Sequence, residues 1–238
     1  MNDAWRAFRL SLSLISLQLT MNSNLQAPEK TIYHDNAIDR GFIWLFAKKM
    51  SNAVGQKNHL PGYDGFVDLS QRIMLGRNAS EQQALVTVVL RSLVPSAVLW
   101  IIRTLVKPTR LVCELNAWFA TKLFTWLVGP CEVREAEITN PDGTTQLQSS
   151  NVHIVKCRYL EQSECVGMCV NMCKLPTQAF FTEDFGIPVT LTPNFEDYSC
   201  DMVFGQIPPD LTTEDAYQHP CLSACETATL SACPKVRS

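Results

Sequence analysis

The cysteines are the residues of this chain best suited to chemistry. Ten occur among 238 residues, and eight of them follow residue 150. Cys165, Cys169 and Cys173 are spaced four residues apart, and Cys221 and Cys225 repeat that spacing. On an α-helix a step of four residues turns the side chain by only about 40°, so each group would share one helix face. Thiolates that converge from two segments suit an iron–sulfur cluster or another thiolate-rich metal site.

Two other uses of these cysteines stay open. Buried cysteines can act as small hydrophobic side chains or pair as disulfides, although disulfides along one helix at this spacing are geometrically awkward. The spacing matches neither the C-x2-C pairs of zinc ribbons nor the ferredoxin run. For the two groups taken together we predict metal or redox chemistry, with further candidates at Cys157, Cys200 and Cys233.

Other motifs narrow the function classes. The chain has no G-x-S-x-G, P-loop or G-x-G-x-x-G sequence, so hydrolase, NTPase and dinucleotide-binding functions have no support. His34, His59 and His219 lie in loop-like sequence, and His153 lies in an alternating segment typical of a half-buried strand. A net charge of −3 gives no general attraction to nucleic acid. No residue can be given a catalytic role from these patterns.

The elements that must position the cysteines form two parts. Apolar residues spaced three to four apart, with capping and stop signals, predict helices in the first part. We expect these helices at 38–54 with Asp35 as the cap, at 63–75, from a Ser80–Gln83 capping box to Pro95, at 96–106 and at 109–128. Their aromatic residues form a core that would also suit a long apolar pocket: Phe42, Trp44, Phe46, Trp100, Trp118, Phe119, Phe124 and Trp126.

The second part changes period. Alternation at 132–139 and 152–156 around an Asn-Pro-Asp-Gly turn predicts a β-hairpin. A helix carrying cysteines is expected at 163–174, a helical turn from Pro176 to Gly186, strands at 188–191 and 200–204, and a last helix at 221–230. The predicted class is α+β, with a leader at 1–30, a helical part at 31–130 and a cysteine-rich part at 131–238 that together with the helical part makes one folded unit.

Charge is unevenly distributed along the chain. Residues 29–110 carry a net +5 and residues 111–238 a net −9. Residues 1–28 have the Arg and Ser content of an organelle transit peptide. A signal peptide and a frayed N-terminus are the alternatives for this segment. The long apolar stretches at 84–106 and 111–128 are interrupted by Arg91, Pro95, Arg103, Glu114 and Lys122. A charge at the bilayer centre is costly, so we predict peripheral membrane contact, not a spanning helix.

Several longer stretches carry a family resemblance. WLVGPCEVREAE (126–137), VHIVKCRYLEQSECVGMCVNMCKLPTQAFF (152–181) and PNFEDYSCDMVFGQIPP (193–209), followed by HPCLSAC, resemble the plant plastid β-carotene isomerase family of the strigolactone pathway. Upstream, YHDNAIDR and GYDGFVDL resemble the family's N-terminal region. The resemblance covers roughly residues 31–227.

The resemblance implies an iron-containing plastid isomerase that interconverts all-trans and 9-cis β-carotene early in strigolactone biosynthesis. The implied iron, mononuclear or in an iron–sulfur cluster, would draw its ligands from Cys157, Cys165, Cys169, Cys173, Cys200, Cys221 and Cys225. Cys131 also falls in the matching motifs, whereas Cys113 and Cys233 do not. His219 stands where the family usually has glutamine, which makes it a poor ligand candidate.

The expected partners are a carotenoid substrate and a membrane surface, without nucleic acid. A non-catalytic iron or iron–sulfur protein for electron transfer or assembly is the alternative, and a zinc- or disulfide-stabilised interaction domain is a third reading.

Overall fold

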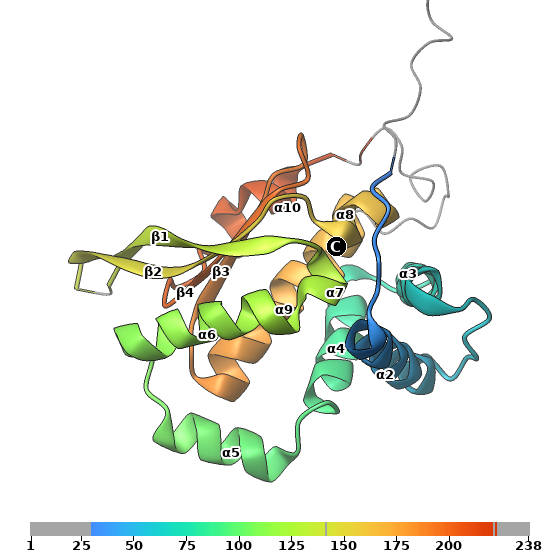
Figure 1. The fold of residues 1–238 in the computed structure, drawn as a ribbon, viewed down its shortest axis with the longest axis horizontal. Coiled ribbons are helices and arrows are strands. Elements are labelled where there is room, and N and C mark those ends of the chain that lie inside the picture. The colour runs from blue at the N-terminus through green and yellow to red at the C-terminus, as the bar shows by residue number, and fades with distance from the viewer. Residues whose placement is uncertain (1–29, 141, 221, 223–238) are drawn as a thin grey trace, which may run out of the picture. The chain divides into compact units, whose positions relative to one another are not determined.

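The computed structural model describes residues 30–140, 142–220 and 222, and those from Tyr33 onward belong to one unit. Helices come first in the chain, then a β-hairpin, a second run of helices and two more strands (Figure 1). The predicted α+β class is confirmed. The leader, the helix expected at 221–230, and Cys221, Cys225 and Cys233 lie outside the described residues.

The first run of helices follows the predicted order, with small corrections at the ends. Its members are α2 (Ala37–Val54), α3 (Gly62–Met74), α4 (Ala79–Arg91), α5 (Ser96–Leu105), α6 (Arg110–Leu123) and α7 (Thr125–Val128). The helix expected at 109–128 breaks at Phe124. The break turns Trp126 into the core, where it stacks on Phe42 with ring centroids 6.2 Å apart.

Both predicted helix caps were wrong by one or two residues. Asn36, not Asp35, caps α2 by accepting hydrogen bonds from the backbone of Ile38 and Asp39. The carboxylate of Asp35 instead pairs with Arg158, at 2.5 and 3.0 Å. Asn78 and Glu81 form the capping box of α4, two residues before the predicted pair. Several Asx and Ser residues in a row offer alternative caps, and backbone geometry selects among them.

The sheet has four antiparallel strands in the order β1-β2-β4-β3. They are β1 (Cys131–Thr139), β2 (Thr145–Ile154), β3 (Val189–Pro193) and β4 (Cys200–Phe204). β2 begins seven residues before the prediction because its first half is polar. Gln148 and Ser150 are buried there and both donate to the carbonyl of Phe204, at 3.0 and 2.8 Å, so their polarity hides the strand's alternation.

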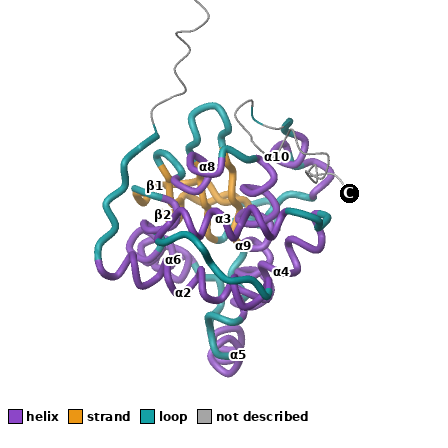
Figure 2. Tube along the Cα trace, turned by 90° about the vertical axis from the view of Figure 1, so that its right-hand side faces the viewer, coloured by secondary structure: helices purple, strands orange, loops and turns teal. Residues whose placement is uncertain are grey.

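Between the hairpin and β3 the chain is helical, but not uniformly α-helical. The elements are α8 (Arg158–Ser163), the π-helix η1 (Met168–Lys174), α9 (Leu175–Ala179) and the π-helix η2 (Phe180–Phe185), ending at the left-handed Gly186. After β4 come the 3-10 turn η3 (Leu211–Thr213) and α10 (Asp215–Gln218). Figure 2 shows the strands surrounded by helices, with α5 far from the sheet. π-helical turns are rare and are often found at functional sites.

Candidate functional site

An apolar cavity of about 470 Å³ lies between one face of the sheet and the helices. Its lining comes from the helices α2, α4 (at its end), α6, α7, α8, η1, α9 and η2 and from all four strands. A volume of this size is in the range of small-molecule sites. Residues distant in sequence therefore combine in one site that no single motif marks.

The strands place alternate side chains on the cavity face. Cys131, Ile154, Cys200 and Pro193 are paired across β1, β2, β4 and β3, and all four line the cavity. Two residues further along, Val152, Met202 and Leu191 form the next row of the lining. Side chains alternate between the two faces of a strand, so pairing in this register builds a continuous apolar floor. In this floor Ile154, the last residue of β2, lies between the thiols of Cys131 and Cys200.

The helices supply mainly aromatic walls. Five of the eight aromatic residues singled out in the sequence line the cavity, while Trp44, Trp100 and Trp118 are exposed. The sequence analysis missed the aromatic group of η2, in which Phe181 is in ring contact with both Phe180 and Phe185. The four-residue spacing of Phe181 and Phe185, next to the cysteine segment, is the signal that could have revealed this wall.

Of the cysteines that the structure describes, five line the cavity, and all five are free thiols. They are Cys131 at the start of β1, Cys157 after β2, Cys169 and Cys173 on η1, and Cys200 at the start of β4. Burial raises the pKa of Cys131 and of Cys157 to about 11 and that of Cys173 to about 12, from an ordinary 9.0. These thiols are therefore protonated at neutral pH.

Four of the five thiols are close enough to influence one another. Burial raises the pKa of Cys169 well above its usual value, and Cys173, Cys200 and Cys157 raise it further. The pKa of Cys200 is raised by burial and then by Cys157 and Cys173, against the opposing charge of Lys174. Desolvation, which disfavours the thiolate, is the dominant cause in both cases. The cluster is thus neutral, soft and apolar, unlike an activated nucleophile.

Of the predicted stripe of three cysteines, two line the cavity and the first does not. Cys165 precedes η1, and its sulfur lies 4.0 Å from that of Met74 on α3 instead of lining the cavity. Cys169 and Cys173 do face the cavity from η1. The helix expected at 163–174 begins only after Glu164, which has a left-handed φ of 47° and ends α8, and from Met168 to Lys174 it is π-helical instead of α-helical.

One charged side chain lines the cavity, and the sequence analysis missed it. Lys174 is 1% exposed, and its Nζ lies 3.0 Å from Glu214 Oε2 and 3.1 Å from Gln178 Oε1. It also donates to the carbonyl of Leu191. A buried ammonium needs such partners, so Lys174 ties η1 to β3 and to the segment before α10.

The described thiols do not by themselves make a metal centre. Within residues 30–140, 142–220 and 222, no three His, Cys, Asp or Glu side chains form a group that could hold a metal ion. Cys157, Cys169, Cys173 and Cys200 surround a common space without the geometry of a ligand shell. Cys221 and Cys225 lie outside the described residues, so their predicted convergence with η1 stays a prediction.

The histidines have other roles. His153 Nδ1 lies 2.9 Å from Asp201 Oδ1, on the face of the sheet that does not line the cavity. The ring of His219 contacts that of Phe195 at a tilt of 40°, with centroids 4.5 Å apart.

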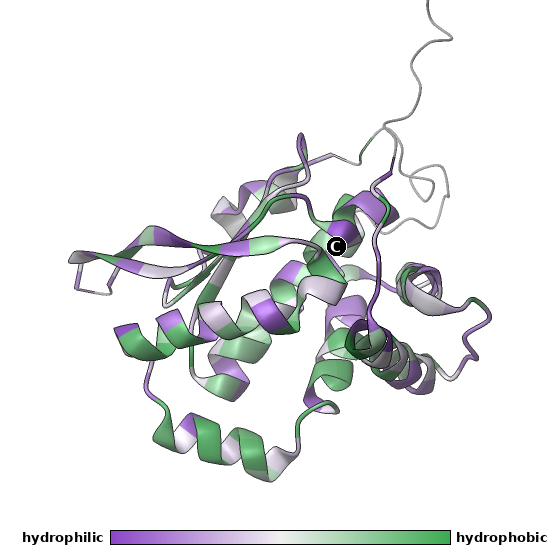
Figure 3. Ribbon diagram, in the orientation of Figure 1, coloured by the Kyte–Doolittle hydropathy of each residue, from purple (hydrophilic) through white to green (hydrophobic). Residues whose placement is uncertain are grey.

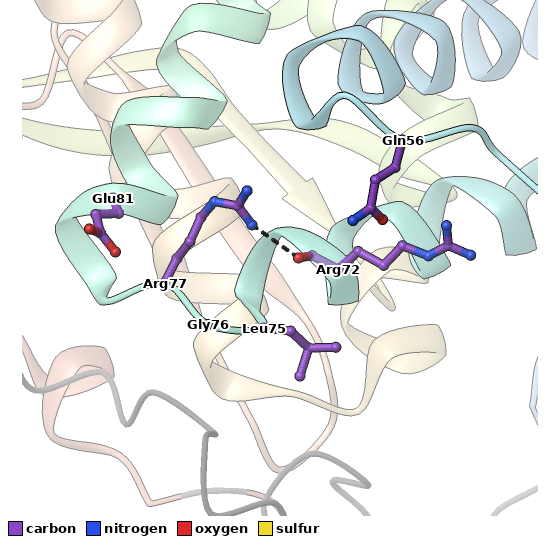
Figure 4. Close-up of a pocket in the computed structure, with 6 residues that line it drawn as sticks. All are labelled: Gln56, Arg72, Leu75, Gly76, Arg77 and Glu81. Atoms are coloured by element: carbon purple, nitrogen blue, oxygen red, sulfur yellow. Dashed lines mark hydrogen bonds between the residues drawn. The ribbon is translucent and has the colours of Figure 1, made fainter.

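A second hollow, of about 670 Å³, has a structural explanation. Gln56, Arg72, Leu75, Gly76, Arg77 and Glu81 line it (Figure 4). Arg77 donates to the carbonyls of Arg72 and Ile73 at the end of α3, while Arg72 pairs with Asp68 at 2.7 Å. Glu81 belongs to the capping box of α4. The charged groups here join two helices, so we place the functional site at the apolar cavity.

The fold and this cavity define an α+β protein with an apolar cavity beside a cluster of neutral thiols. Residues 126–213, which supply the sheet, the thiols and η2, match the family described as Beta-carotene isomerase D27-like, C-terminal. Over 195 residues the chain is 40% identical to Beta-carotene isomerase D27, chloroplastic, of Medicago truncatula, covering 82% of this chain and 75% of that protein. The chain therefore belongs to the β-carotene isomerase D27 family.

A second relative gives the same result. The Arabidopsis thaliana protein of the same name is 36% identical over 195 residues, with 81% of this chain and 72% of that protein covered. The names of both relatives specify the chloroplast, which confirms the predicted plastid location. No solved structure matches the chain.

Proposed function

We propose that this chain is a carotenoid cis/trans isomerase that interconverts all-trans and 9-cis β-carotene. The observation that carries the proposal is the apolar cavity, whose floor and thiols come from the stretch that matches the isomerase family. Two relatives named β-carotene isomerase support the same substrate.

The shape of the cavity suits one end of a carotene. β-Carotene is a long rigid hydrocarbon with a ring at each end, and the bond that becomes 9-cis lies close to one ring. A site that isomerises this bond needs to enclose only that ring and the neighbouring part of the polyene. Phe119 and Leu123 line the cavity and are also exposed, so the rest of the molecule would leave past α6.

The side chains around the cavity limit the chemistry that the protein itself performs. Rotation about a polyene double bond requires a temporary loss of bond order, through removal of an electron or addition of a proton. Among the described lining residues there is no carboxylate or imidazole, and the raised pKa values make the thiols poor proton donors. The cavity's contribution is to orient the polyene on aromatic walls and to keep water from the intermediate.

The direct test is conversion of carotene by the purified chain. All-trans and 9-cis β-carotene, each dispersed in detergent, are incubated with the protein, and the isomers are separated by chromatography. We expect both starting isomers to approach the same mixture, and heat-denatured protein to leave each unchanged. Absence of conversion in protein that contains iron would favour the alternative, a non-catalytic iron protein.

We also propose that the reaction depends on iron and serves an early step of strigolactone biosynthesis. The support is the family resemblance from which the ligand set was predicted. Metal analysis of anaerobically purified protein tests the iron, with Cys169→Ser expected to lower its content and Cys113→Ser to leave it unchanged. For the pathway, a plant that lacks this protein is expected to release less strigolactone.

A further inference from the structure

We infer that the exposed apolar face of α5 and α6 docks on an anionic lipid bilayer, so that carotene passes from the membrane directly into the cavity. The docking face consists of Val98, Trp100, Ile101 and Leu105 on α5, with Leu115 and Trp118 on α6. The identity of the molecule delivered rests on the proposed function, whereas the docking itself does not.

The exposure of α5 is unusual for so apolar a helix. Of its ten residues only Leu99 is buried, while Trp100 is 68% and Leu105 75% exposed. The helix is coloured mainly as hydrophobic in Figure 3, yet it lies apart from the sheet. Contiguous exposed apolar surface marks protein or membrane contacts, and tryptophan is enriched where a membrane meets water. The face therefore fits a lipid interface.

The charges around this face select an anionic surface. From Ser92 to Cys113 the chain has no Asp or Glu but carries Arg103, Lys107 and Arg110. Arg110 pairs with Glu114 at 2.8 Å, whereas Arg103 and Lys107 form no ion pair with a carboxylate of the described residues. Cations beside an apolar face are attracted to anionic headgroups. A second protein partner would have to supply an acidic rim to match them.

The length and direction of α5 indicate docking on one leaflet. None of the described helices is long and apolar enough to cross a membrane alone, although α4 and α5 together pass by length and composition, with a 91° bend between them. The ten residues of α5 span about 15 Å, about half of a hydrocarbon core of about 30 Å. At that bend α5 can lie along the surface while α4 stays in the protein.

The docking face is continuous with the rim of the cavity. Phe119 and Leu123 are on α6, next to Leu115 and Trp118, and they line the cavity while remaining exposed. Leu93 and Val94, at the turn that leads into α5, also line it. A hydrocarbon that moves from the bilayer into the cavity would therefore stay on apolar surface throughout.

Vesicle flotation tests the docking. Vesicles of phosphatidylcholine, with or without phosphatidylglycerol, are mixed with the protein without carotene and centrifuged upward through a density gradient. We expect the protein to float with the anionic vesicles and less with the neutral ones. Trp100→Glu and Leu105→Glu should each lower the bound fraction at least tenfold, since each places a charge in the apolar contact.

Matched control variants test whether the effect is specific to the docking face or follows from changing any exposed tryptophan or lysine. Trp44 on α2 is 61% exposed, so Trp44→Glu makes the same change at a similar exposure and should leave flotation unchanged. Arg103→Glu and Lys107→Glu should each lower binding to anionic vesicles by about fivefold or more, and high salt should remove the difference. Lys57→Glu, far along the chain from α5, serves as the charge control.

Three results would overturn the inference. The wild-type protein stays at the bottom with both vesicle types, or Trp44→Glu abolishes flotation as strongly as Trp100→Glu. The third result is a dimer in light scattering that Trp100→Glu dissociates, while neither the wild-type protein nor the variant floats. The face would then be a contact between two copies of this chain.

Activity measurements keep the docking distinct from the proposed function. Trp100→Glu should isomerise β-carotene in detergent at the wild-type rate and lose activity on carotene held in vesicles. A wild-type protein that floats but converts nothing in detergent would refute the isomerase and leave the docking intact.

Discussion

The stretch from η1 to η2 and the helix α5 use similar residues in opposite ways. Both are rich in large apolar side chains, but those of η1 and α9 are mostly buried around the cavity, whereas α5 buries one residue in ten. The difference lies in what covers them. η1 packs against α3, α4 and α8, and α9 packs against α4 and β3, while α5 follows α4 after a 91° bend.

Apolar composition alone therefore does not determine whether a segment is buried. A segment is buried when another element presents a matching face, and α4 provides one for η1 and α9, with β3 also against α9. α5 has no such cover among the described residues beyond η2. One region thus surrounds a cavity and the other presents apolar surface to its surroundings.

The largest expected effect breaks the buried ion pair of the enclosing region. Lys174→Met leaves Glu214, which is 8% exposed, without its cation. Removing one partner of a buried pair costs about 3–5 kcal/mol, and urea unfolding measures the loss. The double variant Lys174→Met/Glu214→Leu should regain most of this stability. A single variant within about 1 kcal/mol of wild type would show that the pair does not hold η1 in place.

Replacing one leucine in each region by alanine compares how much each region's apolar side chains contribute to stability. Leu160 of α8 is fully buried beside the cavity, and Leu160→Ala should lower the free energy of unfolding by about 2–5 kcal/mol. Leu105 of α5 is 75% exposed, and Leu105→Ala should change it by less than about 0.5 kcal/mol. Equal losses at both positions would mean that α5 is covered in the folded protein, and the comparison would fail.

The buried thiols predict a loss of stability at alkaline pH. The pKa of Cys157 is about 11 in the folded protein, against 9.0 ordinarily, so above pH 9 the unfolded chain binds fewer protons than the folded one. Stability should therefore fall from pH 9 to pH 11, by up to about 1.4 kcal/mol per pH unit for this thiol. Denaturant titrations at several pH values should show a shallower fall in Cys157→Ala, and an unchanged slope would contradict the burial of the thiol.

The smallest effect concerns the cap of the helix that leads to α5. Asn78→Ala removes the side chain that caps α4 and should cost about 1 kcal/mol in denaturant unfolding. Ser80→Ala alters the cap that the sequence alone suggested and should change stability by less than about 0.5 kcal/mol. The reverse order would restore the sequence-based assignment.

Much of the fold follows from sequence patterns because periodicity and stop signals are local. α3, α5 and β4 lie within a residue or two of prediction, since Pro61, Pro95 and alternating side chains define them. The polar half of β2 was missed because its buried Gln148 and Ser150 both donate hydrogen bonds to the carbonyl of Phe204, a partner distant in sequence. The burial of Lys174 was missed for the same reason, because its partner Glu214 is also distant in sequence.

The site was predicted only in part, because a cavity is a property of tertiary structure. Cysteine spacing pointed to Cys165, Cys169 and Cys173, of which Cys169 and Cys173 line the cavity and Cys165 lies against Met74. Strand register, which sequence does not specify, brings Cys131 and Cys200 onto the cavity floor through Ile154. The sequence patterns therefore predicted which types of residue form the site, but not where each of them lies in the fold.

The central claim, that carotene is isomerised in the cavity, is tested most directly by filling it. Ala120 on α6 lines the cavity and is 3% exposed, whereas Ala47 on α2 is 5% exposed and does not line it. Ala120→Phe should stay folded and convert all-trans β-carotene at least tenfold more slowly in detergent. Ala47→Phe should lose about 1–3 kcal/mol of stability and still convert when folded. Wild-type conversion by folded Ala120→Phe would contradict the account.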